Sequence, residues 1–186
     1  MKNKINENRP LAFIVLAVVV VLSIALSGGG GLRSLRADVM QVFRTGVNGD
    51  GLCVYTDLQE RADCAYNLAA LALRYNEIPQ DIGQKAEAAA NEIVNVKNDD
   101  TSAMKRANDA LGRTVEALYT ELENADLSET DATYALSQYK EFTSRGLTIS
   151  RDGYNSLAEE FNRTIGVFPA NLVAMVSGVG QLTLFR

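Results

Sequence analysis

The chain has 186 residues, of which 47% are hydrophobic, and a formal net charge of −5. This length accommodates one domain and a terminal appendage, and an acidic balance opposes binding to a phosphate backbone. Histidine is absent, which removes the commonest general base and transition-metal ligand, and two cysteines alone cannot form a zinc site. We therefore expect no nucleic-acid partner, no enzymatic activity, no cofactor and no metal.

The N-terminal part contains one long apolar segment, which follows a short polar stretch at residues 1–9. The 23 residues between Arg9 and Arg33 carry no charge. As a helix they would span about 34 Å, more than the roughly 30 Å of a bilayer core. We predict a single-pass transmembrane anchor over residues 10–27, in contact with the lipid bilayer. Ala25-Leu26-Ser27 also fits a signal-peptidase site, but the apolar run is long for a signal peptide, which favours an uncleaved anchor.

The residues on either side of this segment bear on its orientation and flexibility. Basic residues flank both ends almost equally, and the denser cluster at Lys2, Lys4 and Arg9 favours a soluble domain on the extracytoplasmic side. Runs of glycine are flexible and form helices poorly. We therefore predict a hinge at Gly28–Gly31, within a linker over residues 28–51 that also contains a short helix.

The end of this linker and the residues after it contain a possible calcium-binding loop and a possible disulfide. In Gly46–Gly51, three residues match positions of a calcium-binding loop, but glycine and aspartate occupy the first and twelfth positions, which favours a flexible turn. Cys53 and Cys64 would be roughly 16 Å apart on one helix, too far for a disulfide. A bridge is conceivable if Cys53 precedes the helix, although two half-buried thiols are the favoured interpretation.

From residue 52 to residue 168 apolar residues recur at spacings of three and four, which is typical of helices that bury one face. The pattern predicts helices over residues 57–75, 79–96, 101–124 and from 128 onward, the last broken near Gly146 and resuming at about Ser150. Capping residues predict helix starts at Asp57, within Asn98–Thr101 and at Ser128. Because the connections are short, neighbours must be antiparallel. We predict an all-α protein, an antiparallel up-down four-helix bundle preceded by a single N-terminal transmembrane helix.

Three aromatic residues with nearby asparagines recur at intervals of seven near the C-terminus. They are Tyr154-Asn155, Phe161-Asn162 and Phe168-Pro169-Ala170-Asn171. This pattern resembles the terminal signature of the LemA family, and Arg74–Pro79 is similar to that family's first inter-helix turn. The resemblance implies a membrane-anchored antiparallel helical bundle with no established catalytic activity. Seven residues are about two helical turns, so we expect the three aromatic rings on one helix face.

The signature residues are the candidate structural or interaction site: Tyr154, Asn155, Phe161, Asn162, Phe168, Pro169 and Asn171. We expect the two amides of Asn155 and Asn162 to bond to backbone groups rather than to a ligand. The apolar tail, residues 169–186, either docks on the bundle or is presented to a partner. The favoured function is a membrane-tethered interaction or scaffold module that binds another envelope or membrane protein. The alternative is a sensory bundle in which some of the seven tyrosines surround a small ligand.

Overall fold

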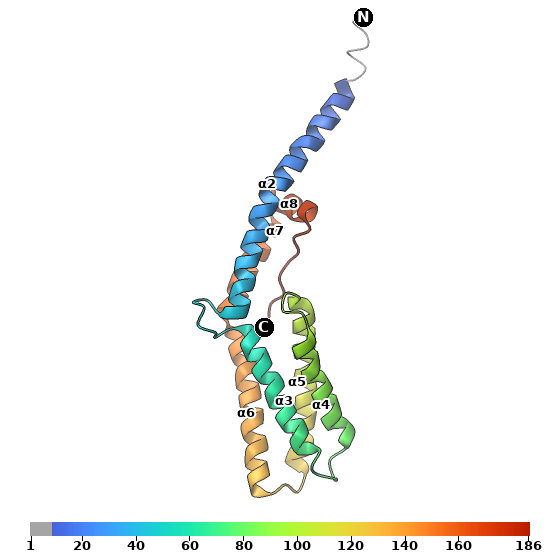
Figure 1. Ribbon diagram of the computed structural model, residues 1–186, viewed down its shortest axis with the longest axis vertical. Helices are drawn as coiled ribbons and strands as arrows, with labels where there is room; N and C mark the ends of the chain where they lie inside the picture. The colour runs from blue at the N-terminus through green and yellow to red at the C-terminus, as the bar shows by residue number, and fades with distance from the viewer. Residues whose placement is uncertain (1–8) are drawn as a thin grey trace, which may run out of the picture. The chain divides into compact units, whose positions relative to one another are not determined.

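The computed structural model describes residues 9–186, with side chains at Phe13, Leu16, Val19 and Ser23 and from residue 28 onward. Within this range all the regular secondary structure is helical (Figure 1). The helices are α2 (Arg9–Thr45), α3 (Val54–Ala72), α4 (Gln80–Asn95), α5 (Thr101–Asn124), α6 (Glu129–Arg151), α7 (Gly153–Gly166) and α8 (Ala170–Ser177). The predicted all-α class is therefore confirmed. Most of the predicted polar N-terminus, residues 1–8, lies outside the described residues.

Helix α2 is one continuous helix of 37 residues. The predicted hinge at Gly28–Gly31 and the separate short helix after it are both wrong, because α2 passes through all four glycines. Among the residues described, no helix reaches the combination of length and hydropathy needed to cross a bilayer. The predicted transmembrane anchor thus stays a prediction.

The described residues form two compact units. Unit 1 combines residues 9–38 with Glu160–Gln181, and unit 2 combines Val39–Glu159 with Leu182–Arg186. Each unit therefore joins segments that are far apart in the sequence.

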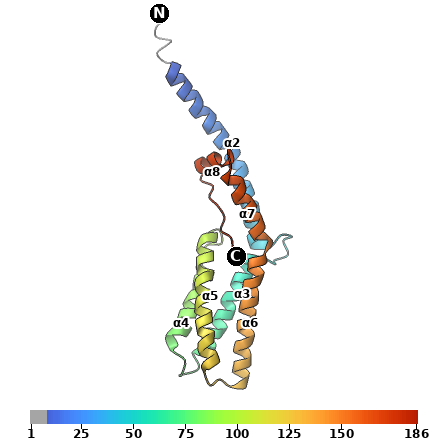
Figure 2. The same ribbon diagram turned by 180° about the vertical axis from the view of Figure 1, so that it is seen from behind.

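Unit 2 is built around α3 to α6, which lie side by side and run alternately in opposite directions (Figures 1 and 2). Helix α3 packs against α4, α5 and α6, and α5 also packs against α4 and α6. Helices α3 and α5 bury the apolar stripes that their sequences predict, whereas α6 buries Ala135 and Phe142 but leaves Leu136 of its predicted stripe exposed. The fully buried side chains include Leu58, Ala62, Ala65 and Leu68 of α3 and Met104, Leu111, Val115 and Leu118 of α5. Burying each large aliphatic side chain contributes about 1.5–3 kcal/mol, and the small alanines let the helices approach closely.

The starts of three helices in unit 2 test the capping predictions. Asp100 caps α5 by accepting a hydrogen bond from the Ala103 N–H at 2.9 Å, and Ser128 caps α6. Both starts were predicted correctly. The start at Asp57 is wrong, because α3 begins three residues earlier and Cys53 is its N-cap.

Asp57 serves another purpose, since its carboxylate pairs with Arg145 of α6 at 3.0 Å. Both Cys53 and Cys64 are buried free thiols, which agrees with the favoured interpretation except that they are more deeply buried than expected.

The break in the last long helix was placed incorrectly. Gly146 lies inside α6, and the helix ends at Arg151, after which Asp152 separates α6 from α7. A Cβ atom at position 146 would come within 2.6 Å of Nη1 of Arg61. Glycine therefore makes room for an arginine at this position and does not break the helix.

The loop between α2 and α3 is a tight glycine turn. Gly46, Gly49 and Gly51 all have positive φ angles, and at Gly46 a Cβ atom would meet the Leu52 carbonyl oxygen at 2.5 Å. Oδ1 of Asp50 accepts the Leu52 N–H at 3.0 Å. Across residues 9–186 no group of three or more acidic, cysteine or histidine side chains is arranged to hold a metal ion.

Candidate functional site

The first signature pair, Tyr154-Asn155, lies at the start of α7 and holds residues 182–186, called here the C-terminal segment. The Tyr154 hydroxyl donates to the Thr183 carbonyl oxygen at 2.9 Å. Oδ1 of Asn155 accepts the Phe185 N–H at 2.7 Å. This pair therefore fixes the backbone of a segment that lies far from it in the sequence.

The amide of Asn155 is buried, with 2% of the residue exposed, and its donor group is also satisfied. Nδ2 donates to the carbonyl oxygen of Ile149 at 2.8 Å, at the end of α6, and to that of Phe185 at 3.4 Å. A buried amide must find such partners, because each unmade hydrogen bond costs about 1–3 kcal/mol. The expectation that Asn155 bonds to backbone groups is confirmed.

Aromatic packing stabilises the same attachment. The rings of Phe43, Tyr154 and Phe185 are mutually in contact, with centroid distances of 5.1, 5.5 and 6.1 Å, in the range of favourable edge and tilted pairs. All three residues are at most 2% exposed. The Oγ1 atom of Thr101, at the start of α5, accepts the Thr183 N–H at 3.2 Å. The C-terminal segment thus completes the core of unit 2.

The remaining signature residues belong to unit 1. Phe161 is buried and Asn162 is half-buried, both on α7. Phe168 is 77% exposed, and Pro169 and Asn171 are also exposed. The prediction of three aromatic rings on one helix face is therefore wrong for Phe168, because α7 ends two residues before it, at Gly166.

Helix α8 packs against the glycines of α2 within unit 1. A Cβ atom at Gly29 would lie 2.8 Å from Cβ of Ser177, and one at Gly28 would lie 3.2 Å from Cγ1 of Val173. Nη2 of Arg33 donates to the Ser177 carbonyl oxygen at 2.8 Å, at the end of α8. These glycines provide the close approach that α8 needs, which is the physical reason why the hinge prediction failed.

The outer side of this region is apolar and exposed. Five side chains form what we call the α8 patch: Val167, Phe168, Leu172, Met175 and Val176, each between 49% and 77% exposed. The sequence carries no charged residue from position 164 to position 185. Five exposed apolar side chains therefore lie within ten residues of the sequence, just after α7 and along α8.

The turn at Arg74–Pro79 connects α3 to α4 in the chain and is hydrogen-bonded to the start of α6. Asp131 accepts hydrogen bonds from the Tyr75 hydroxyl and from Nη2 of Arg74, the latter at 3.2 Å. The Tyr75 hydrogen bond is the main cause that lowers the pKa of Asp131. Glu77 accepts the Asp126 N–H at 2.9 Å. These contacts give the turn a structural role.

The tyrosines do not gather around one cavity. Tyr119 and Tyr139 stack at 3.9 Å, Tyr66 donates to Asn91, and Tyr154 belongs to the aromatic cluster. Tyr119, Tyr134 and Tyr139 each line a different surface groove. This arrangement does not support the alternative of a ligand enclosed by tyrosines.

Sequence analysis missed Arg61, which is 9% exposed on the inner side of α3. Its position carried the signal, because it lies three residues after Leu58 and four before Ala65 on the buried stripe. A charged residue at such a position needs either a partner or a role.

The molecule is an all-helical protein in which a Tyr-Asn pair and an aromatic cluster attach a distant C-terminal segment to the core. The LemA family model matches residues 53–186, which run from the N-cap of α3 to the C-terminal segment, and the chain belongs to the LemA family. The resemblance drawn from the signature is confirmed. No curated protein and no solved structure matches the chain.

Proposed function

We propose that this protein is a non-catalytic module tethered to a membrane by residues 10–27, and that it acts as an interaction or scaffold protein at the cell envelope. The observation that carries the proposal is the charge-free apolar run between Arg9 and Arg33, which lies within the continuous helix α2. A helix satisfies its own backbone hydrogen bonds, which is the condition for entering a bilayer.

Side chains in this part of α2 support a lipid environment. Phe13, Leu16 and Val19 are 70%, 59% and 51% exposed, so a surrounding apolar medium would remove a large apolar area from water. The Ser23 hydroxyl donates to the Val19 carbonyl oxygen at 2.8 Å, which reduces the cost of placing that hydroxyl in lipid.

The α8 patch supplies a second contact with the lipid surface. Helix α8 packs on Gly28 and Gly29, next to residues 10–27, so its exposed apolar side chains adjoin the proposed anchor. The absence of charge from position 164 to position 185 suits the boundary between headgroups and acyl chains.

Helices α3 to α6, as an antiparallel bundle, then form the part that meets another envelope protein on the extracytoplasmic side. The denser basic cluster before the anchor supports this orientation. Crosslinking in the native membrane with identification of the adduct tests the partner, and protease access in sealed vesicles tests the sidedness. Cleavage of the bundle only from the cytoplasmic side would contradict the orientation, and a bundle without a reproducible adduct would contradict the scaffold role.

Fractionation tests the tether. We expect the full chain to stay with membranes after alkaline extraction, and a chain without residues 2–27 to be extracted by the same treatment. Release of the intact full chain into the aqueous phase would refute the proposal.

The contribution of the α8 patch is measured with the chain that lacks residues 2–27. Phe168→Ser combined with Met175→Ser should reduce its binding to lipid vesicles, because two highly exposed apolar side chains are lost. The matched control is Leu52→Ser with Val94→Ser, which removes exposed apolar side chains from unit 2 and should leave vesicle binding unchanged. Equal binding by both double variants would exclude the patch from lipid contact.

A further inference from the structure

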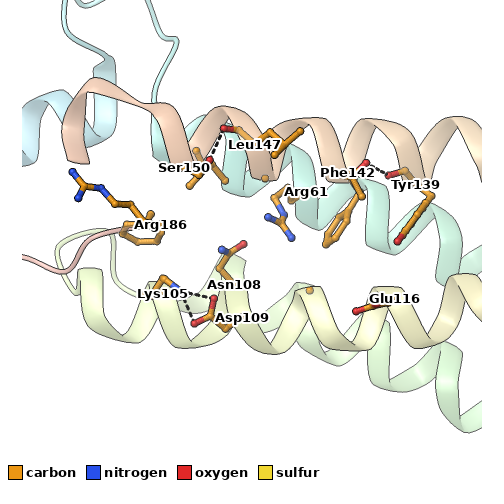
Figure 3. Close-up of a pocket in the computed structure, with 15 residues that line it drawn as sticks. Arg61, Lys105, Asn108, Asp109, Glu116, Tyr139, Phe142, Leu147, Ser150 and Arg186 are labelled. Carbon is orange, nitrogen blue, oxygen red and sulfur yellow. Dashed lines mark hydrogen bonds and ion pairs between the residues drawn. The ribbon is translucent and has the colours of Figure 1, made fainter. Parts of the chain in front are cut away.

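A groove of about 520 Å³ opens between α3, α5 and α6 of unit 2. Its walls combine apolar side chains such as Phe142 and Ile149 with polar ones such as Asn108 and Ser150. The volume lies in the range of small-molecule sites, which are about 300–1,000 Å³ and mostly apolar with a few convergent polar groups. In Figure 3, Arg61 from α3 and Asn108 from α5 point toward one another inside this groove.

Arg61 is a buried cation that lacks an ion-pair or hydrogen-bond partner among the described residues. Its Nε atom is buried without a partner, and so is Oδ1 of Asn108. The guanidinium lies over the ring of Phe142, 4.0 Å from the centroid, which occupies one face and leaves the N–H edge for another group. Burial lowers the pKa of Arg61 to about 10, so the guanidinium remains charged at neutral pH.

The other charges of the groove indicate what kind of anion would fit. Lys105 pairs with Asp109 at 2.6 Å, and Arg186 pairs with Glu159 at 2.6 Å. The lining holds three basic and two acidic side chains, Arg61, Lys105 and Arg186 against Asp109 and Glu116. Asp109 neutralises Lys105 and Glu159 neutralises Arg186, so Arg61 is the lining cation without an ion pair among the described residues. One negative charge suffices to pair with it, whereas a dianion would be repelled by Asp109 and Glu116.

Two glycines, which have no side chain, leave space for the guanidinium of Arg61. A Cβ atom at Gly146 of α6 would collide with Nη1 at 2.6 Å, and one at Gly112 of α5 would contact Nη2 at 3.6 Å. Arg61 is thus accommodated by backbone on two neighbouring helices. A planar guanidinium held in this way is arranged for bidentate pairing with a carboxylate.

We propose that this groove binds a small organic monocarboxylate, whose carboxylate pairs with Arg61 and whose apolar body lies against Phe142 and Ile149. A hydroxyl on the ligand would donate to Oδ1 of Asn108. This assignment goes beyond the tethering and scaffold function and does not depend on it.

The test uses the full chain in detergent and 3-phenyllactate as the probe, with 3-phenyllactamide as its neutral counterpart and inorganic phosphate as a dianion. We expect the acid to raise the unfolding temperature in scanning calorimetry with a saturating dependence on concentration. The amide and phosphate should have a much smaller effect. Titration calorimetry gives the dissociation constant of the acid.

Arg61→Gln should weaken binding of the acid about tenfold or more, because a charge-assisted bidentate pair is lost. The matched control is Arg106→Gln, which removes an exposed arginine of α5 that bonds to Ser102 and should leave binding unchanged. If Arg61→Gln fails to fold, the proposal is tested by comparing the shifts in unfolding temperature that the acid and the amide cause in the unaltered chain. Equal responses to the acid and the amide, or no response to the acid, would overturn the proposal. Undiminished binding of the acid by Arg61→Gln would overturn it as well.

Discussion

Two buried polar residues in unit 2 differ in how their groups are satisfied. Asn155 is buried with its oxygen and its nitrogen both bonded to backbone groups. Arg61 is buried with an unpartnered Nε atom. Satisfied buried groups stabilise a fold and specify its geometry, while an unpaired buried charge destabilises it. We therefore expect substitutions at these two residues to change the free energy of unfolding in opposite directions.

Asn155→Ala is expected to destabilise the full chain by about 2–3 kcal/mol, because it leaves the Phe185 N–H and the Ile149 carbonyl without their side-chain partner. Urea unfolding measures the loss, and hydrogen exchange at the Phe185 amide should become faster. Unchanged protection of that amide would contradict the role assigned to Asn155.

Arg61→Met is expected to stabilise the protein. Burial lowers the pKa of Arg61 from 12.5 to about 10, so the charged form is disfavoured in the folded state, and this penalty persists at all pH values below about 10. The shift corresponds to about 3 kcal/mol, from which the loss of the contact with Phe142 subtracts about 1 kcal/mol. Urea unfolding at neutral pH should show a gain of about 1–2 kcal/mol, with Arg106→Met as the unchanged control. A destabilised Arg61→Met would mean that the guanidinium has a structural role.

Titration of the buried carboxyl group of Asp152 should make the stability of the protein depend on pH. Burial raises its pKa above 3.8, and its Oδ1 accepts the Tyr154 N–H at 2.7 Å, at the start of α7. A carboxyl whose pKa is raised on folding favours the folded state at low pH, and this contribution is lost as the pH rises from about 3.8 through the raised pKa. Asp152→Asn keeps the acceptor and removes the titration. Over that pH interval the free energy of unfolding of the unaltered chain should fall relative to that of Asp152→Asn. A difference between the two unfolding free energies that stays constant with pH would contradict the prediction.

At the scale of elements, the four glycines of α2 are not equivalent. A Cβ atom at Gly28 or Gly29 would press on α8, whereas Gly30 and Gly31 face open space. Glycine in a helix interior costs about 0.5–1 kcal/mol relative to alanine, so a run of four within α2 requires a reason. Close packing of α8 supplies that reason for the first two.

Gly29→Val should therefore displace α8 from α2, while Gly31→Ala should be tolerated or slightly stabilising. Limited proteolysis of the chain near Gly178, just after α8, measures the displacement. Equal protease resistance of the two variants would show that α8 does not depend on Gly29.

The sequence predicts elements well where the determinants are local. Asp100 and Ser128 act as the expected N-caps, and the predicted apolar stripes of α3 and α5 are buried, while that of α6 is buried only in part. The start of α3 was missed because cysteine is an uncommon cap. Gly28–Gly31 and Gly146 were misread because their roles depend on Val173, Ser177 and Arg61, which come from distant parts of the sequence.

The candidate site was predicted in part for the same reason. A buried amide must find partners, so the backbone bonding of Asn155 followed from its pattern. The identity of its partner did not, because nothing local connects Asn155 to Phe185. Phe168 was misplaced because the interval of seven assumed one continuous helix beyond Gly166.

On the scale of the whole molecule, the C-terminal segment joins α2 and α7 within unit 2. Deleting residues 182–186 should lower the unfolding free energy by several kcal/mol, because it exposes the cavity left by Phe185 and unpairs Asn155. Combining the deletion with Asn155→Ala should add much less than the sum of the two effects, since both remove the same contacts. Additive effects in urea unfolding would contradict this coupling.

The position of Phe185 against Phe43 also has a consequence for biosynthesis. The two rings are separated by most of the polypeptide, and translation proceeds from the N-terminus. A nascent chain that has reached only α7 offers Phe43 and Tyr154 an incomplete hydrophobic site. Final consolidation of unit 2 must therefore await emergence of residues 182–186 from the ribosome, after α2 to α8 have all been synthesised.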